Sequence, residues 1–388
     1  MAELPIGEAS LARPLATAVP VVVVDDSSQQ RRYLRNALEA TPEFEVVGEA
    51  RNGREAVSMV ERLGPAAVLM DLDLPIMGGI EAIERIMASR PTPIVVYSAY
   101  VEAENSTNAI EALAAGAVDV IAKPSWRDGT DPDGYADELR RRMRVAARVR
   151  VITHPRGRLR GGIVSRAANR LRPAAVRPTV VTTTSPLHAV GPIRAAGHVQ
   201  LVAIGASTGG PQALATLLGE LPEDFEPAVL VVQHMADGFI PGLVQWLDGL
   251  CPMPVLMGQH GRRLAPGTVT VAPSGLNLLV RDHLRVVCEP PPERQFHVPG
   301  IDPTFFSVSD SCGSEALGVL LTGMGRDGAA GLKSMRDAGA VTIGQDEATS
   351  AVYGMPQAAY ALGAVEYQLP LPEISSAVVT SARSEADS

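Results

Sequence analysis

The chain has 388 residues, enough for two or three domains, and 46% of them are hydrophobic, which suits globular folding. Its formal net charge of −9 argues against nonspecific nucleic-acid binding, which normally depends on a basic surface. The three cysteines, Cys251, Cys288 and Cys312, form no C-x-x-C pair, so neither a disulfide framework nor a cysteine zinc site is expected, and a reducing cytoplasm fits.

The N-terminal stretch carries no pattern for export or membrane insertion. Residues 1–19 contain acids and prolines instead of a continuous apolar run, so we expect no signal peptide. The apolar run at 19–24 is far shorter than the roughly 20 residues that a membrane span needs. We therefore expect a soluble, cytoplasmic protein.

Short apolar runs alternate with helical patterns over the first third of the chain. Strands are predicted at 19–24, 45–50, 67–70, 94–97 and 118–121, and helices at 28–40, 53–62, 78–88 and 107–115. The strand runs are rich in Val, Ile and Leu, which is typical of buried parallel strands. The alternation predicts a doubly wound parallel sheet, and we place this domain at residues 19–138.

The composition changes after this domain. A turn-rich stretch from residue 125 leads into an arginine-rich helical pattern at 137–151, after which Pro, Gly, Arg, Thr and Ser dominate. Such a segment buries little apolar surface, so we interpret residues 139–198 as a linker. Its arginines could form a nucleic-acid tail, but a solvated helix face followed by a linker is the favoured interpretation.

The α/β rhythm returns at residue 199. Strands are predicted at 201–204, 228–232, 268–272, 276–280, 317–321 and 341–344, with helices at 211–218, 240–247 and 328–338. This pattern predicts a second α/β domain with a mainly parallel sheet over residues 199–372. Small and charged side chains close the sequence, and we expect residues 373–388 to form a frayed tail.

Polar side chains stand at the ends of four strands predicted for the first domain: Asp25 and Asp26, Asp71, Ser98, and Lys123. Because the carboxyl ends of parallel strands share one edge of a sheet, these groups should converge there. An aspartate at a strand end is more often a helix cap than a ligand. A cluster of carboxylates, however, favours a hard divalent cation such as Mg²⁺, which would also let a carboxylate attack a phosphoryl donor.

The motifs around these residues resemble the response-regulator receiver domain, a flavodoxin-like doubly wound fold. They are D-D-S after the first strand, D-L-D-L-P-I-M-G-G after the third, S-A after the fourth and K-P after the fifth. The resemblance implies that Asp71 is phosphorylated, with Ser98 and Lys123 supporting the phosphoryl group. It also implies a Mg²⁺ site formed by Asp26, Asp71 and the backbone of Asp73, with Asp25 contributing from behind them or through a water molecule.

A glycine-rich turn follows the first predicted strand of the second domain. The segment I-G-A-S-T-G-G places Ser207 between that strand and a helix that begins near Pro211. The free N–H groups and the dipole of a helix N-terminus would stabilise an oxyanion nearby. The G-x-S-x-G spacing fits a nucleophile elbow, but the turn taken alone fits a phosphate cradle equally well. No Gly-Lys-Ser/Thr follows, which excludes a P-loop.

Two later strand ends supply partners for a serine nucleophile. His234 follows the run V-L-V-V-Q, and a general base is favoured over a merely polar loop histidine because Ser207 ends the neighbouring strand. Asp327 lies in a glycine-rich loop after 317–321 and could orient the imidazole or instead cap the next helix. Its rivals for that role are Asp302, Asp310 and Asp346. The chain order Ser, His, Asp differs from that of α/β-hydrolases.

These segments resemble the chemotaxis protein-glutamate methylesterase family (CheB). The motifs are I-G-A-S-T-G-G, V-V-Q-H-M, L-T-G-M-G-R-D-G-A-A-G and Q-D-E-A-T-S-A-V-Y-G-M-P, and they follow a receiver as in the family. The resemblance implies a catalytic triad of Ser207, His234 and Asp327. It places the oxyanion-binding backbone groups near Thr208 and Met324.

The resemblance also implies a function for the whole chain. It predicts removal of methyl esters from glutamates of chemoreceptors, and deamidation of receptor glutamines, as the adaptation step of a chemosensory pathway. A histidine kinase of that system is the expected phosphodonor, and receiver phosphorylation is expected to relieve a block of the active site. Mg²⁺ is expected in the receiver and no cofactor in the catalytic domain.

One segment departs from the family's pattern. Where family members carry R-H-R-P-S-V-D, this chain has F-H-V-P-G-I-D at 296–302, so both arginines are absent while His297, Pro299 and Asp302 remain. The loss of two guanidinium forks bears on substrate recognition rather than on the chemistry. Two alternatives stay open: a receiver-controlled serine hydrolase of another ester or amide, and a non-enzymatic adaptor gated by the receiver.

Overall fold

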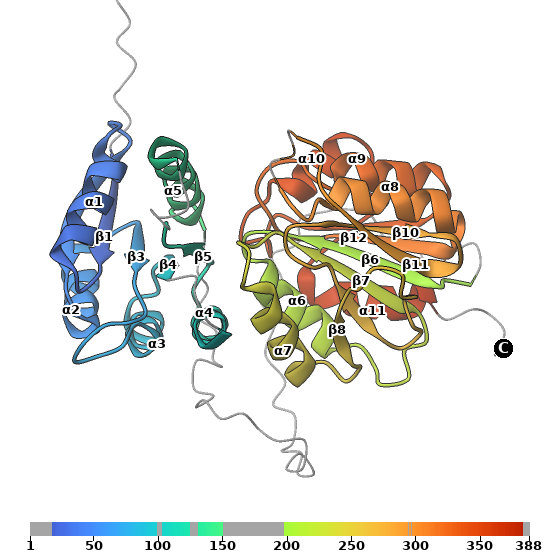
Figure 1. Cartoon of the computed structure of the whole chain (residues 1–388), viewed down its shortest axis with the longest axis horizontal. Helices are drawn as coiled ribbons and strands as arrows, with labels where there is room; N and C mark the ends of the chain where they lie inside the picture. The colour runs from blue at the N-terminus through green and yellow to red at the C-terminus, as the bar shows by residue number, and fades with distance from the viewer. Residues whose placement is uncertain are drawn as a thin grey trace, which may run out of the picture.

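The computed structural model describes residues 18–98, 103–124, 131–149, 198–293, 295 and 297–382. These residues form two α/β domains that lie side by side (Figure 1). Most of the segment predicted as a linker, and Phe296 of the 296–302 segment, fall outside the described residues. None of the helices in the described ranges is long and apolar enough to cross a membrane.

The first domain is a five-stranded parallel sheet of order β2-β1-β3-β4-β5 with helices on both faces. Its strands are β1 (Val19–Val24), β2 (Phe44–Ala50), β3 (Ala67–Met70), β4 (Ile94–Ser98) and β5 (Asp119–Ala122). Its helices are α1 (Ser28–Glu39), α2 (Gly53–Leu63), α3 (Gly79–Ser89), α4 (Ala103–Ala114) and α5 (Pro132–Ala146). The central strands are buried on both faces, as their unbroken apolar runs predict, and the doubly wound sheet is confirmed.

Helix α5 belongs to the first domain. Leu139 and Met143, spaced four residues apart, are fully buried and pack in the same cluster as Val21 and Tyr97. The domain therefore extends past the boundary predicted at residue 138. The arginines of this helix are not those of a solvated linker, because Arg140 donates to the Ala37 carbonyl of α1 and Arg142 pairs with Asp119 of β5.

The second domain contains a seven-stranded parallel sheet of order β14-β13-β12-β6-β7-β9-β8. Its strands are β6 (Leu201–Ala206), β7 (Ala228–Gln233), β8 (Val255–Met257), β9 (Val269–Val271), β12 (Ala316–Leu320), β13 (Val341–Gln345) and β14 (Tyr367–Leu369). A separate antiparallel hairpin is formed by β10 (Asn277–Arg281) and β11 (Arg285–Glu289). The predicted mainly parallel sheet is confirmed.

Six α-helices of the second domain cover its two faces: α6 (Gly210–Gly219), α7 (Ile240–Leu250), α8 (Ile301–Cys312), α9 (Ala329–Asp337), α10 (Met355–Ala361) and α11 (Leu371–Ala382). Short 3₁₀ turns occupy Asp282–Leu284 and Gly313–Glu315. Helix α11 corrects the prediction of a frayed tail from residue 373. Its Ile374 and Val378 are buried one turn apart, and Ser375 donates a hydrogen bond of 2.5 Å to Glu220.

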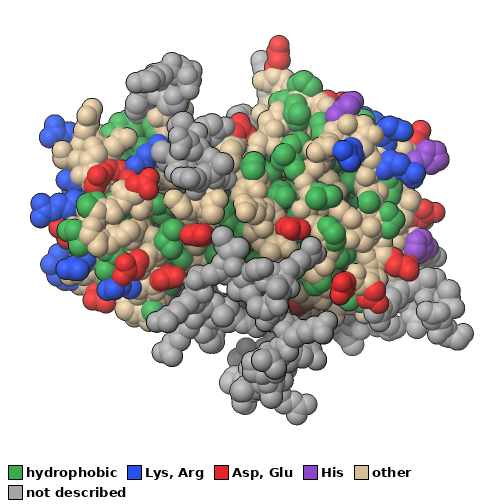
Figure 2. Space-filling model, turned by 60° about the horizontal axis from the view of Figure 1, so that its bottom comes forward, with side chains coloured by type: hydrophobic (Ala, Val, Ile, Leu, Met, Phe, Trp, Pro, Cys, Tyr) green, Lys and Arg blue, Asp and Glu red, His purple; other side chains and the backbone are tan. Residues whose placement is uncertain are grey.

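The two domains meet where α4 of the first packs against α6 and α7 of the second (Figure 1), and where Arg141 of α5 reaches Met324. The apolar core runs without interruption from one domain into the other. Gln212, in the first turn of α6, donates hydrogen bonds to the carbonyls of Leu113 (3.1 Å) and Ala117 (2.6 Å), at the end of α4. Most Lys and Arg side chains visible in Figure 2 lie towards the two outer ends of the molecule, away from this junction.

Candidate active site and candidate phosphorylation site

The carboxylates predicted to meet in the first domain lie together at the carboxyl edge of its sheet. Asp25 follows β1 and Asp71 follows β3, the adjacent strand, and both side chains are almost fully buried. The Lys123 ammonium, just after β5, lies 2.6 Å from Asp71 Oδ2 and 3.2 Å from Asp25 Oδ2. Ser98 is buried at the end of β4, and its carbonyl accepts a hydrogen bond of 2.7 Å from the Lys123 amide.

The charge balance of this cluster favours a divalent cation. The carboxylates of Asp25, Asp26 and Asp71 offer oxygen atoms within 4.8 Å of one another, and Asp26 is exposed. Burial raises the pKa of Asp71 to about 6, although the hydrogen bond and the charge of Lys123 oppose that shift. The oxygen atoms of three carboxylates are ligands of the kind that Mg²⁺ prefers, and the single ammonium of Lys123 leaves part of their negative charge for a cation to balance. Asp73, predicted to contribute its backbone carbonyl, is not part of this side-chain group.

The candidate catalytic residues of the second domain stand beyond the ends of three adjacent strands. Ser207 follows β6, which is the middle strand, and His234 follows β7 on one side. Asp327 lies in the loop after β12 on the other side. The sheet therefore brings the three residues to one edge, where ligands of open α/β sheets bind.

Close packing explains the glycines around Ser207. A Cβ atom on Gly205 would lie 2.5 Å from Ile301, and one on Gly209, whose φ is +75°, would lie 2.5 Å from Ala351. The turn that carries Ser207 is thus packed tightly between the segments of Ile301 and Ala351. A Cβ on Gly323 would lie 2.7 Å from the Cβ of Ser207, so the loop that carries Met324 packs directly against Ser207.

A hydrogen bond joins His234 to Asp327. His234 Nε2 lies 2.8 Å from Asp327 Oδ2, and the histidine side chain is only 6% exposed. Burial alone would raise the pKa of Asp327, but hydrogen bonds from His234 and from the amides of Ile301 and Asp302 outweigh it and lower the pKa to about 2. Asp327 is therefore ionised throughout the physiological range and can stabilise an imidazolium.

The orientation of the imidazole assigns a role to each ring nitrogen. Because Nε2 faces Asp327, only Nδ1 is left to exchange a proton with a nucleophile. Nδ1 is buried and has no hydrogen-bond partner within the described residues, and no hydrogen bond joins it to Ser207 there. Catalytic hydrogen bonds are often loose before substrate binds, so this geometry is compatible with a general base.

The three rival aspartates have other positions. Asp302 accepts a hydrogen bond from the Gly331 amide at 2.7 Å, and Asp310 is exposed on α8. Asp346 accepts hydrogen bonds from the amide and the hydroxyl of Thr349. Among the described aspartates, Asp327 is the one that contacts His234.

Two side chains near the site were not assigned a role from the sequence. Gln233 is buried, and its Nε2 donates hydrogen bonds of 2.8 Å to the carbonyls of both Ser207 and His234, which fixes the two backbones relative to each other. Its place beside His234 in V-V-Q-H-M was the available signal. His297 stacks on His234 with ring centroids 4.5 Å apart, a contact that no sequence pattern indicates.

His297 is a neutral neighbour of His234. Burial, together with the charges of His234 and Arg141, lowers the pKa of His297 to about 4. The ring therefore carries no charge at neutral pH. The 296–302 segment, which departs from the family pattern, thus contacts the candidate base directly.

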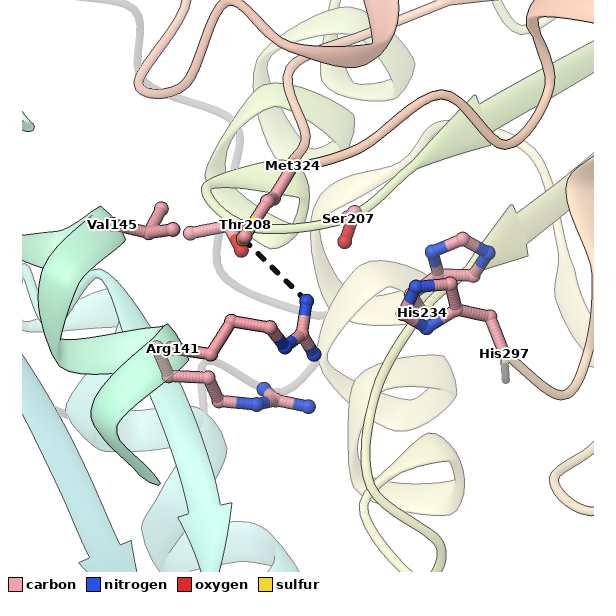
Figure 3. Close-up of a pocket in the computed structure, with 8 residues that line it drawn as sticks. Arg141, Val145, Ser207, Thr208, His234, His297 and Met324 are labelled. Atoms are coloured by element: carbon pink, nitrogen blue, oxygen red, sulfur yellow. Dashed lines mark hydrogen bonds between the residues drawn. The ribbon is translucent and has the colours of Figure 1, made fainter. Parts of the chain in front are cut away.

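Helix α5 of the first domain closes the pocket over Ser207 (Figure 3). Thr208 and Met324 line the pocket beside Ser207, and the Arg141 guanidinium lies 3.5 Å from Met324 Sδ. The remaining cavity measures ≈ 20 Å³, which is room for about one water molecule. Helix α5 therefore restricts access to Ser207 in this arrangement.

Two family models match the chain. The response regulator receiver domain matches residues 21–129, and the CheB methylesterase matches residues 202–378. A protein-glutamate methylesterase/protein-glutamine glutaminase of Paramagnetospirillum magneticum is 40% identical over 94% of this chain and 97% of its own. One of Anaeromyxobacter dehalogenans is 42% identical over 93% of this chain and 96% of its own.

Among solved structures, the CheB methylesterase catalytic domain of Thermotoga maritima is 31% identical. It covers 47% of this chain and 97% of its own, with a TM-score of 0.45.

Proposed function

The chain belongs to the CheB methylesterase family, and from this premise we propose that it demethylates glutamates and deamidates glutamines of chemoreceptors under control of its receiver. The proposal places it in the cytoplasm, as the adaptation enzyme of a chemosensory pathway. The observation that carries the residue assignment is the 2.8 Å hydrogen bond between His234 and Asp327, on the two strands that flank Ser207.

The proposed reaction begins at Ser207. Its Oγ attacks the γ-carbonyl carbon of the methylated glutamate, and the hydroxyl proton passes to Nδ1 of His234. Asp327 stays ionised and stabilises the imidazolium through its hydrogen bond to Nε2. The oxyanion would accept hydrogen bonds from the amides of Thr208 and Met324, neither of which has an acceptor among the described residues.

Collapse of the tetrahedral intermediate breaks the C–O bond to the methoxy group, which leaves as methanol with the proton from His234. Water then attacks the acyl-enzyme with His234 as base, and the second intermediate releases a glutamate carboxylate and Ser207. A glutamine side chain follows the same route, with ammonia as the leaving group.

Asp71 is the proposed phosphorylation site of the receiver. Its carboxylate would attack the phosphorus of a phosphohistidine on a kinase of the chemosensory system, and the P–N bond breaks. Lys123, 2.6 Å from Asp71, would pair with the phosphoryl oxygens, and the Ser98 hydroxyl would donate to one of them. Asp25, Asp26, Asp71 and the backbone of Asp73 would hold Mg²⁺, which shields the incoming phosphoryl charge when bound.

We further propose that the arrangement of the two domains described above is the resting state. With α5 leaving a cavity of ≈ 20 Å³ beside Ser207, substrate binding requires the receiver to move. Phosphorylation at Asp71 would favour that movement by changing the contacts of α4 and α5.

Methanol release from methylated receptors tests these assignments. The protein is incubated with receptors from its own cell, with and without a small phosphodonor, and phosphorylation of the receiver is verified. We expect release to rise on phosphorylation, to vanish in Ser207→Ala, and to stay at the basal level in Asp71→Asn. No release from the phosphorylated protein would refute the substrate, and full activity of Ser207→Ala would refute the nucleophile.

A further inference from the structure

Helices α8 and α9 both begin without a capping side chain of their own. The residue before the first turn is Gly300 in α8 and Gly328 in α9, and neither offers an oxygen to the free amides. The two N-termini lie against each other, because a Cβ on Gly331 of α9 would come within 2.9 Å of the backbone of Asp302 in α8.

Each helix is instead capped by an aspartate associated with the other. Asp327, just before α9, accepts hydrogen bonds of 2.9 Å from the amides of Ile301 and Asp302, the first two residues of α8. Asp302 in turn accepts a hydrogen bond of 2.7 Å from the Gly331 amide in the first turn of α9. The two carboxylates therefore cap the helices reciprocally.

This exchange closes a ring that contains the candidate triad acid. The ring runs from Asp327 along the chain to Gly331, across the hydrogen bond to the Asp302 carboxylate, and back through the Asp302 amide to Asp327 Oδ1. The same carboxylate presents Oδ2 to His234. The direction of Oδ2 is therefore set by the position of α8, which Asp302 ties to α9.

We propose that Asp302 is a positioning residue of this hydrolase, acting on catalysis through Asp327. The proposal rests on the proposed role of Asp327 in the triad. Asp302 contacts neither substrate nor His234 in this scheme. Its carboxylate holds the α8 amides where they orient Asp327 towards His234 Nε2.

The charges of the two aspartates agree with this division of roles. Burial raises the pKa of Asp302 to about 6, against the opposing hydrogen bonds of the Gly331, Gly328 and Ala330 amides, and the charge of Asp327 adds to the rise. Asp327 has a pKa of about 2. When the pH falls, the proton therefore goes to Asp302 first and leaves the triad acid ionised.

A double-mutant cycle separates positioning from general support of the fold. Asp302→Ala and Asp302→Asn are made in the full chain, each alone and combined with Asp327→Asn. The turnover number kcat and KM are measured on phosphorylated protein with receptors that carry labelled methyl groups, so that low residual activity can be quantified. Asp310→Asn, an exposed change on the same helix, is the matched control.

We expect Asp302→Ala to lower kcat roughly 10- to 100-fold with KM within about twofold, because only the orientation of the catalytic pair changes. Asp302→Asn retains an oxygen for the Gly331 amide and should recover most of the loss. In the Asp327→Asn background, Asp302→Ala should lower kcat by less than about twofold.

Three outcomes would overturn the proposal: unchanged kcat in Asp302→Ala, an equal fold-loss in both backgrounds, or a loss expressed in KM. If Asp302→Ala does not fold, Asp302→Leu, which fills the space of the carboxyl group but cannot accept from the Gly331 amide, replaces it in the cycle. Wild-type activity of that variant, or an equal loss in both backgrounds, would overturn the proposal. A wrong triad would be detected separately, since Asp327→Asn alone would then keep full activity.

Discussion

Replacing Arg141 by alanine should raise the activity of the unphosphorylated enzyme. This side chain extends from α5 across the domain junction to Met324, at the opening over Ser207. Its ion pair with Glu138 lies within the same helix and contributes little. Truncation removes one interdomain polar contact and the packing of the aliphatic stem, which together stabilise the closed state by about 1 kcal/mol.

Because about 1.4 kcal/mol corresponds to a tenfold change in an equilibrium constant, the fraction of open molecules should rise roughly fivefold. Basal methanol release should rise by the same factor, while the fully phosphorylated enzyme, already open, should change by less than about twofold. The assay compares initial rates on methylated receptors with and without phosphodonor.

Arg144→Ala is the matched control, since Arg144 lies on the same helix but pairs with Glu43 inside the receiver. The reasoning fails if Arg141→Ala leaves the basal rate unchanged, or if Arg144→Ala raises it equally.

Three further predictions concern the two sites. Asp327→Asn should lower kcat by about 10²- to 10⁴-fold because it removes the charge that stabilises the imidazolium; near-normal turnover would contradict this role. Asp71 has a raised pKa of about 6 in the folded state, so its ionised form costs stability as the pH rises from about 4 through 6. Asp71→Asn should therefore increase the free energy of unfolding by about 1 to 3 kcal/mol at pH 8 and hardly at pH 4. Urea denaturation at the two pH values measures this difference, and an equal change at both would exclude the titration of Asp71 as its cause. Gly209→Ala should abolish methanol release and lower the free energy of unfolding by about 1 to 3 kcal/mol in urea denaturation, because its Cβ would meet Ala351 and its φ is +75°. Wild-type stability would show that the turn relaxes.

The sequence predicts the parallel sheets well because their central strands are buried on both faces and read as unbroken apolar runs. It misses α8, where Thr304, Ser307 and Ser309 occupy buried positions and hide the helical period. The Ser307 hydroxyl donates to the Thr304 carbonyl one turn earlier, while those of Thr304 and Ser309 donate to the carbonyls of Leu278 and Ser334, which only the folded chain brings near. The edge strands β8 and β14 have three residues each, too few to show a pattern.

The candidate triad follows from strand ends, since a parallel sheet carries such residues to one edge whatever the loops do. The neighbours of the triad do not follow in this way. The stacking of His297 on His234 and the reach of Arg141 over Ser207 join elements far apart in the sequence. Which imidazole nitrogen faces Asp327 is likewise set by side-chain direction, on which residue spacing carries no information.

The narrow cavity beside Ser207 has a thermodynamic consequence. On the proposed regulation, receptor glutamate and the docked receiver exclude each other, so substrate and phosphoryl group bias one equilibrium in the same direction. Coupling between two sites is reciprocal. If phosphorylation of Asp71 raises the affinity for receptor by some factor, bound receptor must raise the equilibrium constant for phosphorylation of Asp71 by the same factor. Receptors would then act as effectors of the receiver as well as substrates, and heavily methylated arrays would themselves favour the modification that leads to their demethylation.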